Sequence, residues 1–85
     1  MISKIVIKKS AQKELDSLPK GDQVRIVEAI RSLVSEEGDI KAIKNMIDTF
    51  RLRVGRYRVL FHADSERSLI TIWRIAHRKV AYRNL

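Results

Sequence analysis

The chain has 85 residues and a formal net charge of +8, and it contains no cysteine. A chain of this length is expected to form one domain over residues 1–85, with a modest core, because only about 65% of its surface can be buried on folding. The absence of cysteine excludes disulfides and thiolate chemistry and fits a cytoplasmic location. Apolar runs stay well short of the ~20 residues that a membrane span needs, so we expect no membrane insertion.

The positive charge is concentrated in the C-terminal half. Residues 1–45 carry nine Lys/Arg and seven Asp/Glu, whereas residues 46–85 carry nine and three, so the two net charges are +2 and +6. Such a field attracts polyanions through Coulomb steering and through counterion release from phosphates. Nucleic acid, with RNA favoured, is therefore the expected partner, although an acidic protein or an anionic membrane surface would be attracted by the same field.

The N-terminal half predicts one strand followed by two helices. Residues 2–7 are rich in Ile and Val, which is typical of a short strand. Apolar spacing predicts a helix from an N-cap at Ser10 to Pro19, where the proline ends it. A second helix is predicted to start at an N-cap at Asp22 and to close at Gly38.

The C-terminal half predicts three antiparallel strands. Residues 40–46 give no clear signal and are expected to be a connector. Turn signals at 54–57 and 63–66 divide the β-like segment that follows, and the last strand, 69–76, is apolar on both faces, as a central strand would be. The element order β-α-α-β-β-β predicts an α+β fold in which a helical hairpin packs on an antiparallel sheet.

The first of these turns fixes the pairing of the two strands that it joins. Gly55-Arg56 as a two-residue loop suits a type II′ turn, which favours glycine at its first central position. The register that follows pairs residues 49–54 with residues 57–62, and it separates an apolar face from a cationic face. The cationic face carries Thr49, Arg51, Arg53, Arg58, Leu60 and His62.

Arg53 and Arg58 face each other in this register, and neither strand contains an acid. Like charges directly opposite each other destabilise a sheet, so an external anion is expected to offset the repulsion, and guanidinium groups match phosphate oxygens two at a time. The alternative is an ordinary solvated face. Trp73 is expected in the core rather than as a stacking platform for bases. A second cluster follows the last strand and consists of His77, Arg78, Lys79, Tyr82 and Arg83.

These residue types exclude several kinds of catalysis. We find no metal-ligand set, phosphate-binding glycine loop or nucleophile-base-acid triad, so no metal or cofactor is expected. Arginines with a histidine and a tyrosine instead suit RNA cleavage in which the RNA's own 2′-hydroxyl is the nucleophile. The arginines would stabilise the charge on the phosphorane, and His77 or Tyr82 would move protons.

The segment Phe50–Phe61, followed by Ile75–Arg78 and Tyr82, resembles the RelE/ParE toxin superfamily of type II toxin-antitoxin systems. The segment Ser10–Pro19 is also similar to that family, so the resemblance covers nearly the whole chain. It implies a microbial-ribonuclease-like α+β fold. For the RelE branch, which is favoured here, it also implies cleavage of messenger RNA in the ribosomal A site.

The resemblance also implies roles for individual residues. Arg58 and Arg78 would contact the phosphate or transition state, Tyr82 would stack on a base or move protons, and His77 is the further expected catalytic residue. Thr49 and Arg51 stand where the RelE branch often has lysines, including a proposed general base. Arginine holds its proton too tightly for that task, so His77 or His62 would serve instead. Basic contacts to RNA are expected from Arg51, Arg53, Arg56, Lys79 and Arg83.

Two other functions stay open at this point. The ParE branch uses the same scaffold to inhibit DNA gyrase without nuclease activity, and an inactive relative could survive as half of a complex. In each case the resemblance implies a cognate antitoxin, and the charge of +8 suits an acidic or amphipathic segment that wraps the toxin. For an active RelE-type toxin, the ribosome and messenger RNA are the expected further partners.

Overall fold

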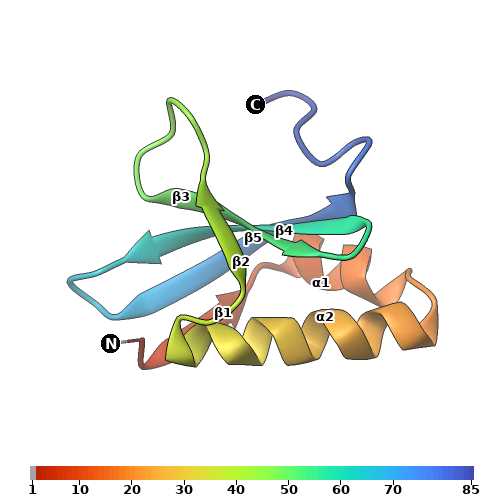
Figure 1. Cartoon of the computed structure of the whole chain (residues 1–85), viewed down its shortest axis with the longest axis horizontal. Helices are drawn as coiled ribbons and strands as arrows, with labels where there is room; N and C mark the ends of the chain where they lie inside the picture. Colours follow the sequence, from red (N-terminus) through yellow and green to blue (C-terminus); the bar gives the residue numbers. More distant parts are fainter. Residues whose placement is uncertain (1) are drawn as a thin grey trace.

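Two helices cover one face of a five-stranded sheet in the computed structural model, which describes residues 2–85 (Figure 1). The strand order is β1-β5-β4-β3-β2, so β5, β4 and β3 are internal. Neither helix in this part of the chain has the length and apolar character to cross a membrane. The elements are β1 (Lys4–Ile7), α1 (Lys9–Asp16), α2 (Lys20–Ser32), the 3-10 turn η1 (Leu33–Ser35), β2 (Asp39–Ala42), β3 (Thr49–Val54), β4 (Tyr57–Asp64) and β5 (Leu69–His77).

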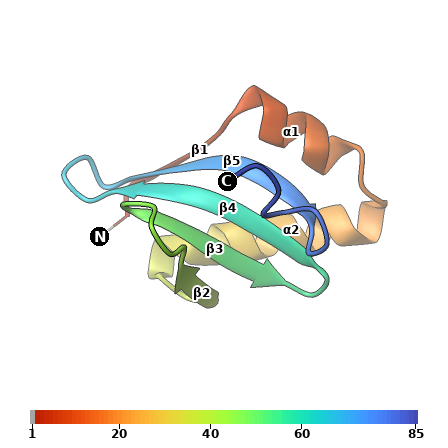
Figure 2. The same cartoon turned by 90° about the horizontal axis from the view of Figure 1, so that it is seen from above.

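The α+β architecture is confirmed, but the sheet is mixed rather than wholly antiparallel. β1 runs parallel to β5, while the other neighbouring strands are antiparallel. The helices carry the chain from one edge of the sheet to the other, where β2 forms a strand in the segment predicted as a connector (Figure 2). Because β2 has four residues and three of them are exposed, its sequence lacks the apolar alternation that reveals a strand.

Both helices begin earlier than predicted. α1 starts at Lys9 and α2 at Lys20, so Ser10 and Asp22 lie inside the first turns and neither is an N-cap. A proline precedes α2, and its fixed φ angle suits the entry to a helix without any side-chain cap. The carboxylate of Asp22 accepts a hydrogen bond from the Tyr57 hydroxyl at 2.9 Å instead.

The predicted hairpin register is confirmed for all six pairs between residues 49–54 and 57–62. Gly55 has a φ of 58°, while Arg56 is not among the residues with positive φ. That combination fits a type II′ turn, in which only the first central residue has positive φ. The turn and the strand register therefore agree, and they fix which side chains face the helices.

The main core lies between the helices and the sheet. Leu52, Val59 and Phe61 line it from β3 and β4, on the face predicted to be apolar. The chain thus buries one face of the sheet and leaves the other to the C-terminal segment and solvent. The buried cluster consists of Ala11, Leu15, Ile26, Ile30, Leu33, Leu52, Val59, Phe61, Ile70, Ile72 and Ile75.

Candidate functional site

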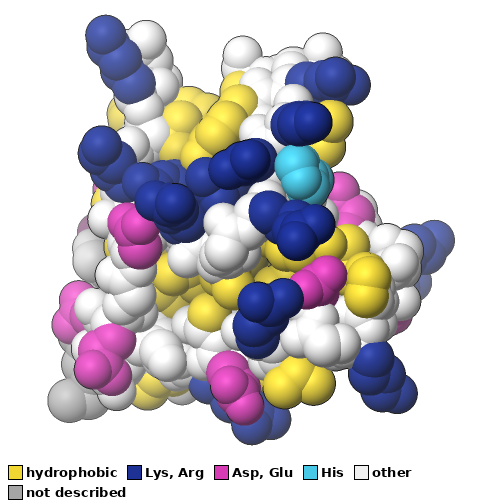
Figure 3. All heavy atoms as spheres, turned by 45° about the vertical axis from the view of Figure 1, so that its right-hand side comes forward, with side chains coloured by type: hydrophobic (Ala, Val, Ile, Leu, Met, Phe, Trp, Pro, Cys, Tyr) yellow, Lys and Arg dark blue, Asp and Glu magenta, His cyan; other side chains and the backbone are white. Residues whose placement is uncertain are grey.

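The face of the sheet that the helices leave free, here called the open face, carries the predicted cationic cluster. Alternation along β3 and β4 puts Arg51, Arg53 and Arg58 on it, and the pairing of β4 with β5 adds Arg74 opposite Leu60. Figure 3 shows Lys and Arg side chains as a band across the molecule. Sequence reasoning missed Arg74, because strict alternation along the last strand gives no reason to place it beside the others.

An acid on the neighbouring strand offsets part of this charge. Asp39 of β2 lies 3.2 Å from Arg51 and 3.9 Å from Arg53, measured between carboxylate oxygen and guanidinium nitrogen. The expectation that only an external anion could relieve Arg53 is therefore wrong. It failed because β2 was not recognised as a strand, so its carboxylate could not be placed beside β3.

Arg58 is in a different situation. Its Nη1 donates hydrogen bonds to the carbonyl oxygens of Gly55 at 3.1 Å and Tyr57 at 2.9 Å, and the side chain is half-buried. Within residues 2–85 no carboxylate forms an ion pair with it. The guanidinium is thus held in place while its charge stays available, which is the arrangement that binding an oxyanion requires.

A β-bulge brings an aromatic ring to the same face. Leu60 pairs with Arg74 but the next residue, Phe61, pairs with Ile72, so Trp73 is the extra residue on β5. Trp73 and Arg74 therefore both lie off the core, and the Arg74 guanidinium carbon is 5.3 Å from the centre of the indole ring. The prediction that Trp73 belongs to the core is wrong, because a bulge shifts the alternation by one residue.

The C-terminal segment, residues 78–85, crosses over the open face. Nη1 of Arg74 donates to the carbonyl oxygens of Ala81 at 2.9 Å and Arg83 at 2.8 Å. Leu60 and Ala81 are both 0% exposed, although neither belongs to the main core. Figure 2 shows this segment lying over β4 and β5. The C-terminal segment therefore buries Leu60, an apolar residue in the middle of an otherwise polar face.

Two separate parts of the sequence meet where this segment begins. The backbone N–H of Arg78 donates to the carbonyl oxygen of Arg56 at 2.8 Å, which joins the segment to the turn between β3 and β4. The side chains of Arg56, Arg78 and Lys79 are exposed, and Tyr82 is 44% exposed. Arg56, Arg78 and Lys79 therefore lie at the same end of the sheet as Arg58, where Arg56 also lines a pocket on the helix side with Asp22.

The two histidines lie on opposite faces of the sheet. His77 pairs with Tyr57, and their rings meet edge to face with centres 6.0 Å apart on the helix side, so the structure does not bring His77 onto the face of Arg58. Its Nδ1 accepts the Lys79 backbone N–H at 3.1 Å, so the neutral ring carries its proton on Nε2. His62 is exposed on the open face, where its Nδ1 lies 3.2 Å from the Thr49 hydroxyl.

Hydrogen bonding shifts the pKa of two groups that join α2 to the hairpin. The Tyr57 hydroxyl and then the Arg25 side chain, both bonded to Asp22, hold the pKa of that carboxyl below its ordinary value of 3.8. The same bond, with Tyr57 as donor, raises the pKa of the Tyr57 phenol above 10.0. This contact fixes the end of the sheet that carries Arg58 against the start of α2.

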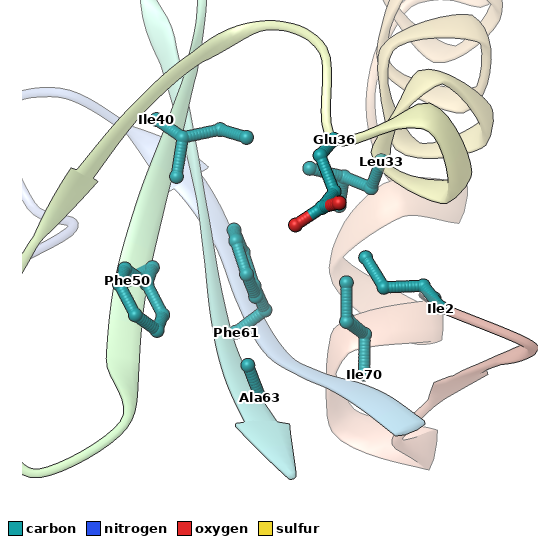
Figure 4. A pocket seen from close by; sticks show the side chains of 8 residues that line it. All are labelled: Ile2, Leu33, Glu36, Ile40, Phe50, Phe61, Ala63 and Ile70. Atoms are coloured by element: carbon teal, nitrogen blue, oxygen red, sulfur yellow. The ribbon is translucent and has the colours of Figure 1, made fainter. Parts of the chain in front are cut away.

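A cavity on the opposite, helix-facing side of the sheet has a different chemistry (Figure 4). Its volume is about 160 Å³, and its lining offers one carboxylate and no cation. A phosphate would be repelled there, so the open face is the candidate site. The cavity is lined by Ile2, Leu33, Glu36, Ile40, Phe50, Phe61, Ala63 and Ile70.

Comparisons with known proteins show the family to which the chain belongs. A family model described as "ParE toxin of type II toxin-antitoxin system, parDE" matches residues 5–82. A relative from Methanocaldococcus jannaschii that carries the name RelE1 is 31% identical over 85 residues, which cover 94% of each chain. The chain belongs to the RelE/ParE family of toxins of type II toxin-antitoxin systems.

Solved structures confirm the RelE-like fold. The RelB-RelE antitoxin-toxin complex from Methanococcus jannaschii contains a chain 29% identical to this one, with a TM-score of 0.76 over 91% of this chain and 94% of that chain. The RelE-RelB complex from Pyrococcus horikoshii OT3 contains a chain that is 28% identical, with a TM-score of 0.76 over 95% of this chain and 100% of that chain. The RelBE2 complex from Mycobacterium tuberculosis contains a chain that is 28% identical, with a TM-score of 0.78 over 92% of this chain and 94% of that chain.

Proposed function

We propose that this toxin is a ribosome-dependent messenger RNA endoribonuclease of the RelE type. The observation that carries the proposal is the guanidinium of Arg58, which is half-buried, held by two backbone carbonyls and free of any carboxylate among residues 2–85. The relatives named RelE support the same branch of the family. An oxyanion that forms at Arg58 would meet a preorganised positive charge.

The chemistry needs no cofactor. The RNA 2′-oxygen attacks the adjacent phosphorus as its proton leaves, and the 5′-oxygen of the next nucleotide departs and takes up a proton, which yields a 2′,3′-cyclic phosphate and a 5′-hydroxyl. Arg58 and Arg78 would stabilise the charge on the phosphorane, and Tyr82 would stack on a base or move a proton. The remaining phosphate contacts are assigned to Arg51, Arg53, Arg56, Lys79 and Arg83.

Proton transfer is assigned to a histidine. His77 follows Ala76, the cross-strand partner of Arg58, so it lies at the same end of the sheet but on the opposite face, and its neutral ring carries an Nε2–H donor. His62 lies on the face of Arg58 but four residues along β4, a distance of about 13 Å. Neither histidine therefore lies beside Arg58, and proton transfer by His77 would require the RNA to bend around the end of the sheet.

A second function is favoured by one specific observation, namely that the matching family model carries the ParE description. In that case the basic face would bind DNA gyrase and no RNA would be cut. Expression of the toxin without an antitoxin separates the two functions. Messenger 5′ ends that cluster within translated codons support the endoribonuclease, whereas gyrase-linked DNA breaks with intact messengers support the gyrase inhibitor and refute our first proposal.

Besides messenger RNA and the ribosome, we propose that an antitoxin is a partner of this toxin. The related chains from Methanococcus jannaschii and Pyrococcus horikoshii were solved in complex with RelB. The net charge of +8 and the exposed or half-buried arginines of the open face suit an acidic, amphipathic segment that covers this surface. Such a segment would neutralise the toxin by occupying the arginines that RNA needs.

A further inference from the structure

The open face has a second end, away from Arg58, that carries fewer charges. A groove of about 620 Å³ lies there, between the C-terminal segment and the loop that joins β2 to β3. Thr49, His62, Thr71, Trp73 and Arg74 contribute to its walls, and no Asp or Glu side chain does. In Figure 3, hydrophobic side chains fill the hollow beside the basic band, between the two segments that rise above the sheet.

The bulge in β5 gives this groove its aromatic wall. With regular alternation, either Trp73 or Arg74 would face the core, but the extra residue turns both toward the open face. The indole is half-buried, so it is held by its surroundings while part of the ring lines the groove. Arg74 lies at the boundary between the groove and the C-terminal segment, because it lines the groove and donates hydrogen bonds to the carbonyl oxygens of that segment.

The polar groups of the groove are unusually well defined. The Thr49 hydroxyl donates its only proton to the carbonyl oxygen of Ile47 at 2.9 Å, so the Nδ1 of His62, 3.2 Å from the same oxygen, must be the donor in that second bond. The neutral His62 ring is therefore left with Nε2 as an acceptor. The Thr71 hydroxyl and the Trp73 indole N–H, which line the groove with it, make no hydrogen bond within residues 2–85.

We infer that this groove is a nucleobase subsite, which receives a base of the same RNA strand whose phosphate lies at Arg58. The inference rests on the proposed function. A flat aromatic wall beside the His62 acceptor, the Thr71 hydroxyl and the Asn84 amide suits a heterocycle that is apolar on its faces and polar on its edge. Arg58 and His62 lie about 13 Å apart on β4, and the C-terminal segment covers Leu60 between them, so an extended RNA would pass over this segment to occupy both positions.

The properties of the groove argue for a nucleotide rather than an apolar chain. Lys8 and Arg74 line the groove together with neutral side chains and without any Asp or Glu, so the groove can accept a neutral ring and also attract an anionic backbone. Base stacking on aromatic side chains is worth about tenfold to a hundredfold in affinity per base. The groove would therefore determine which sequences are bound next to the cleaved phosphate.

Intrinsic fluorescence tests the subsite directly, because Trp73 is the single tryptophan of the chain. The probe is a short single-stranded RNA with 2′-O-methyl groups, which cannot be cut, and the comparison is the same backbone without bases. We expect both strands to bind by anisotropy and only the strand with bases to quench Trp73. Binding without quenching, equal quenching by both strands, or no RNA binding at low salt overturns the subsite.

Cleavage in a translation extract keeps this inference separate from the proposed function. We expect Trp73→Ala to cut about tenfold to a hundredfold more slowly, to lose the base preference at one position beside the cut, and to be rescued in part by Trp73→Phe. Val24→Ala, at a 52% exposed position on α2, is the control and should change neither property. If folded Trp73→Ala keeps the wild-type rate and preference, the subsite is wrong. If the wild-type toxin cuts no messenger, the proposed function fails, and the fluorescence result alone decides the subsite.

Discussion

Glu14 of α1 completes the hydrogen bonding of β5 beyond the end of β1. β1 stops at Ile7, which pairs with Ile72, so the backbone N–H of Ile75 has no strand on that side and donates to Glu14 Oε1 at 3.0 Å. Ile75 is buried, and an unpaired N–H there costs about 1–3 kcal/mol. We expect Glu14→Ala to lower the free energy of unfolding in urea by that amount and Glu14→Gln to lower it less.

The exposed Glu28 of α2 offers the matched control for Glu14, because its side chain makes no hydrogen bond within the described residues. Glu28→Ala should leave the urea midpoint nearly unchanged. Equal losses at Glu14 and Glu28 would contradict a specific role for the Glu14 carboxylate.

The contact between Asp22 and Tyr57 makes stability depend on pH. The Tyr57 hydrogen bond is the main reason that the pKa of Asp22 lies below 3.8, and the bond from Arg25 adds to it. A carboxyl with a lowered folded-state pKa stabilises the fold above its unfolded pKa, and the stabilisation is lost as pH falls through the folded-state pKa. We therefore expect urea midpoints measured from about pH 5 downward to fall less steeply for Asp22→Asn than for the wild type. Glu66→Gln is the control, and parallel curves for Asp22→Asn and the wild type would refute the coupling.

Among the elements, those with local signals could be predicted and those that depend on neighbours could not. The hairpin between β3 and β4 was predicted pair by pair, because Gly55 specifies the turn and apolar alternation specifies the faces. β2 was missed because an exposed four-residue edge strand carries no alternation. Trp73 and Arg74 were misplaced or missed because a bulge arises from pairing with β4, and the sequence of β5 alone does not contain that pairing. The site residues proposed from sequence remain predictions.

Substitution by alanine is expected to change the free energy of unfolding in opposite directions at Gly38 and Gly21. Gly38, between η1 and β2, has a φ of +125°, and a Cβ there would lie 2.7 Å from Leu52 Cδ1. Gly21 lies in the first turn of α2, with no atom within 4 Å of an added Cβ. We expect Gly38→Ala to lower the free energy of unfolding by about 1–3 kcal/mol and Gly21→Ala to raise it by roughly 0.5 kcal/mol. Thermal denaturation of both variants measures this, and a neutral Gly38→Ala would show that the loop relaxes freely.

At the scale of the whole molecule, the charge of +8 makes partner binding sensitive to salt. Screening weakens attraction between exposed charges once the Debye length falls from about 10 Å at 0.1 M to about 3 Å at 1 M salt. We expect the dissociation constant of the antitoxin complex to rise with ionic strength, mainly through slower association. Titration calorimetry and stopped-flow measurements over this range test it. An affinity that does not change would mean that apolar docking dominates.

We propose that RNA is cleaved on the open face, at the end that carries Arg58. Loss of one preorganised donor to a developing oxyanion costs about a hundredfold to a thousandfold in rate. Arg58→Ala also relieves a like-charge contact with Arg53. Because Asp39 already offsets part of the charge of Arg53, the free energy of unfolding should stay the same or rise only slightly. Arg67→Ala, at an exposed side chain in the turn before β5, is the control.

The decisive measurement is the rate of messenger cleavage by Arg58→Ala in a translation extract, taken together with its urea midpoint. We predict a rate about a hundredfold to a thousandfold below that of the wild type and of Arg67→Ala, at an unchanged or slightly higher midpoint. An Arg58→Ala protein that cuts at the wild-type rate, or that loses activity only because it unfolds, would contradict the assignment of this face as the active site.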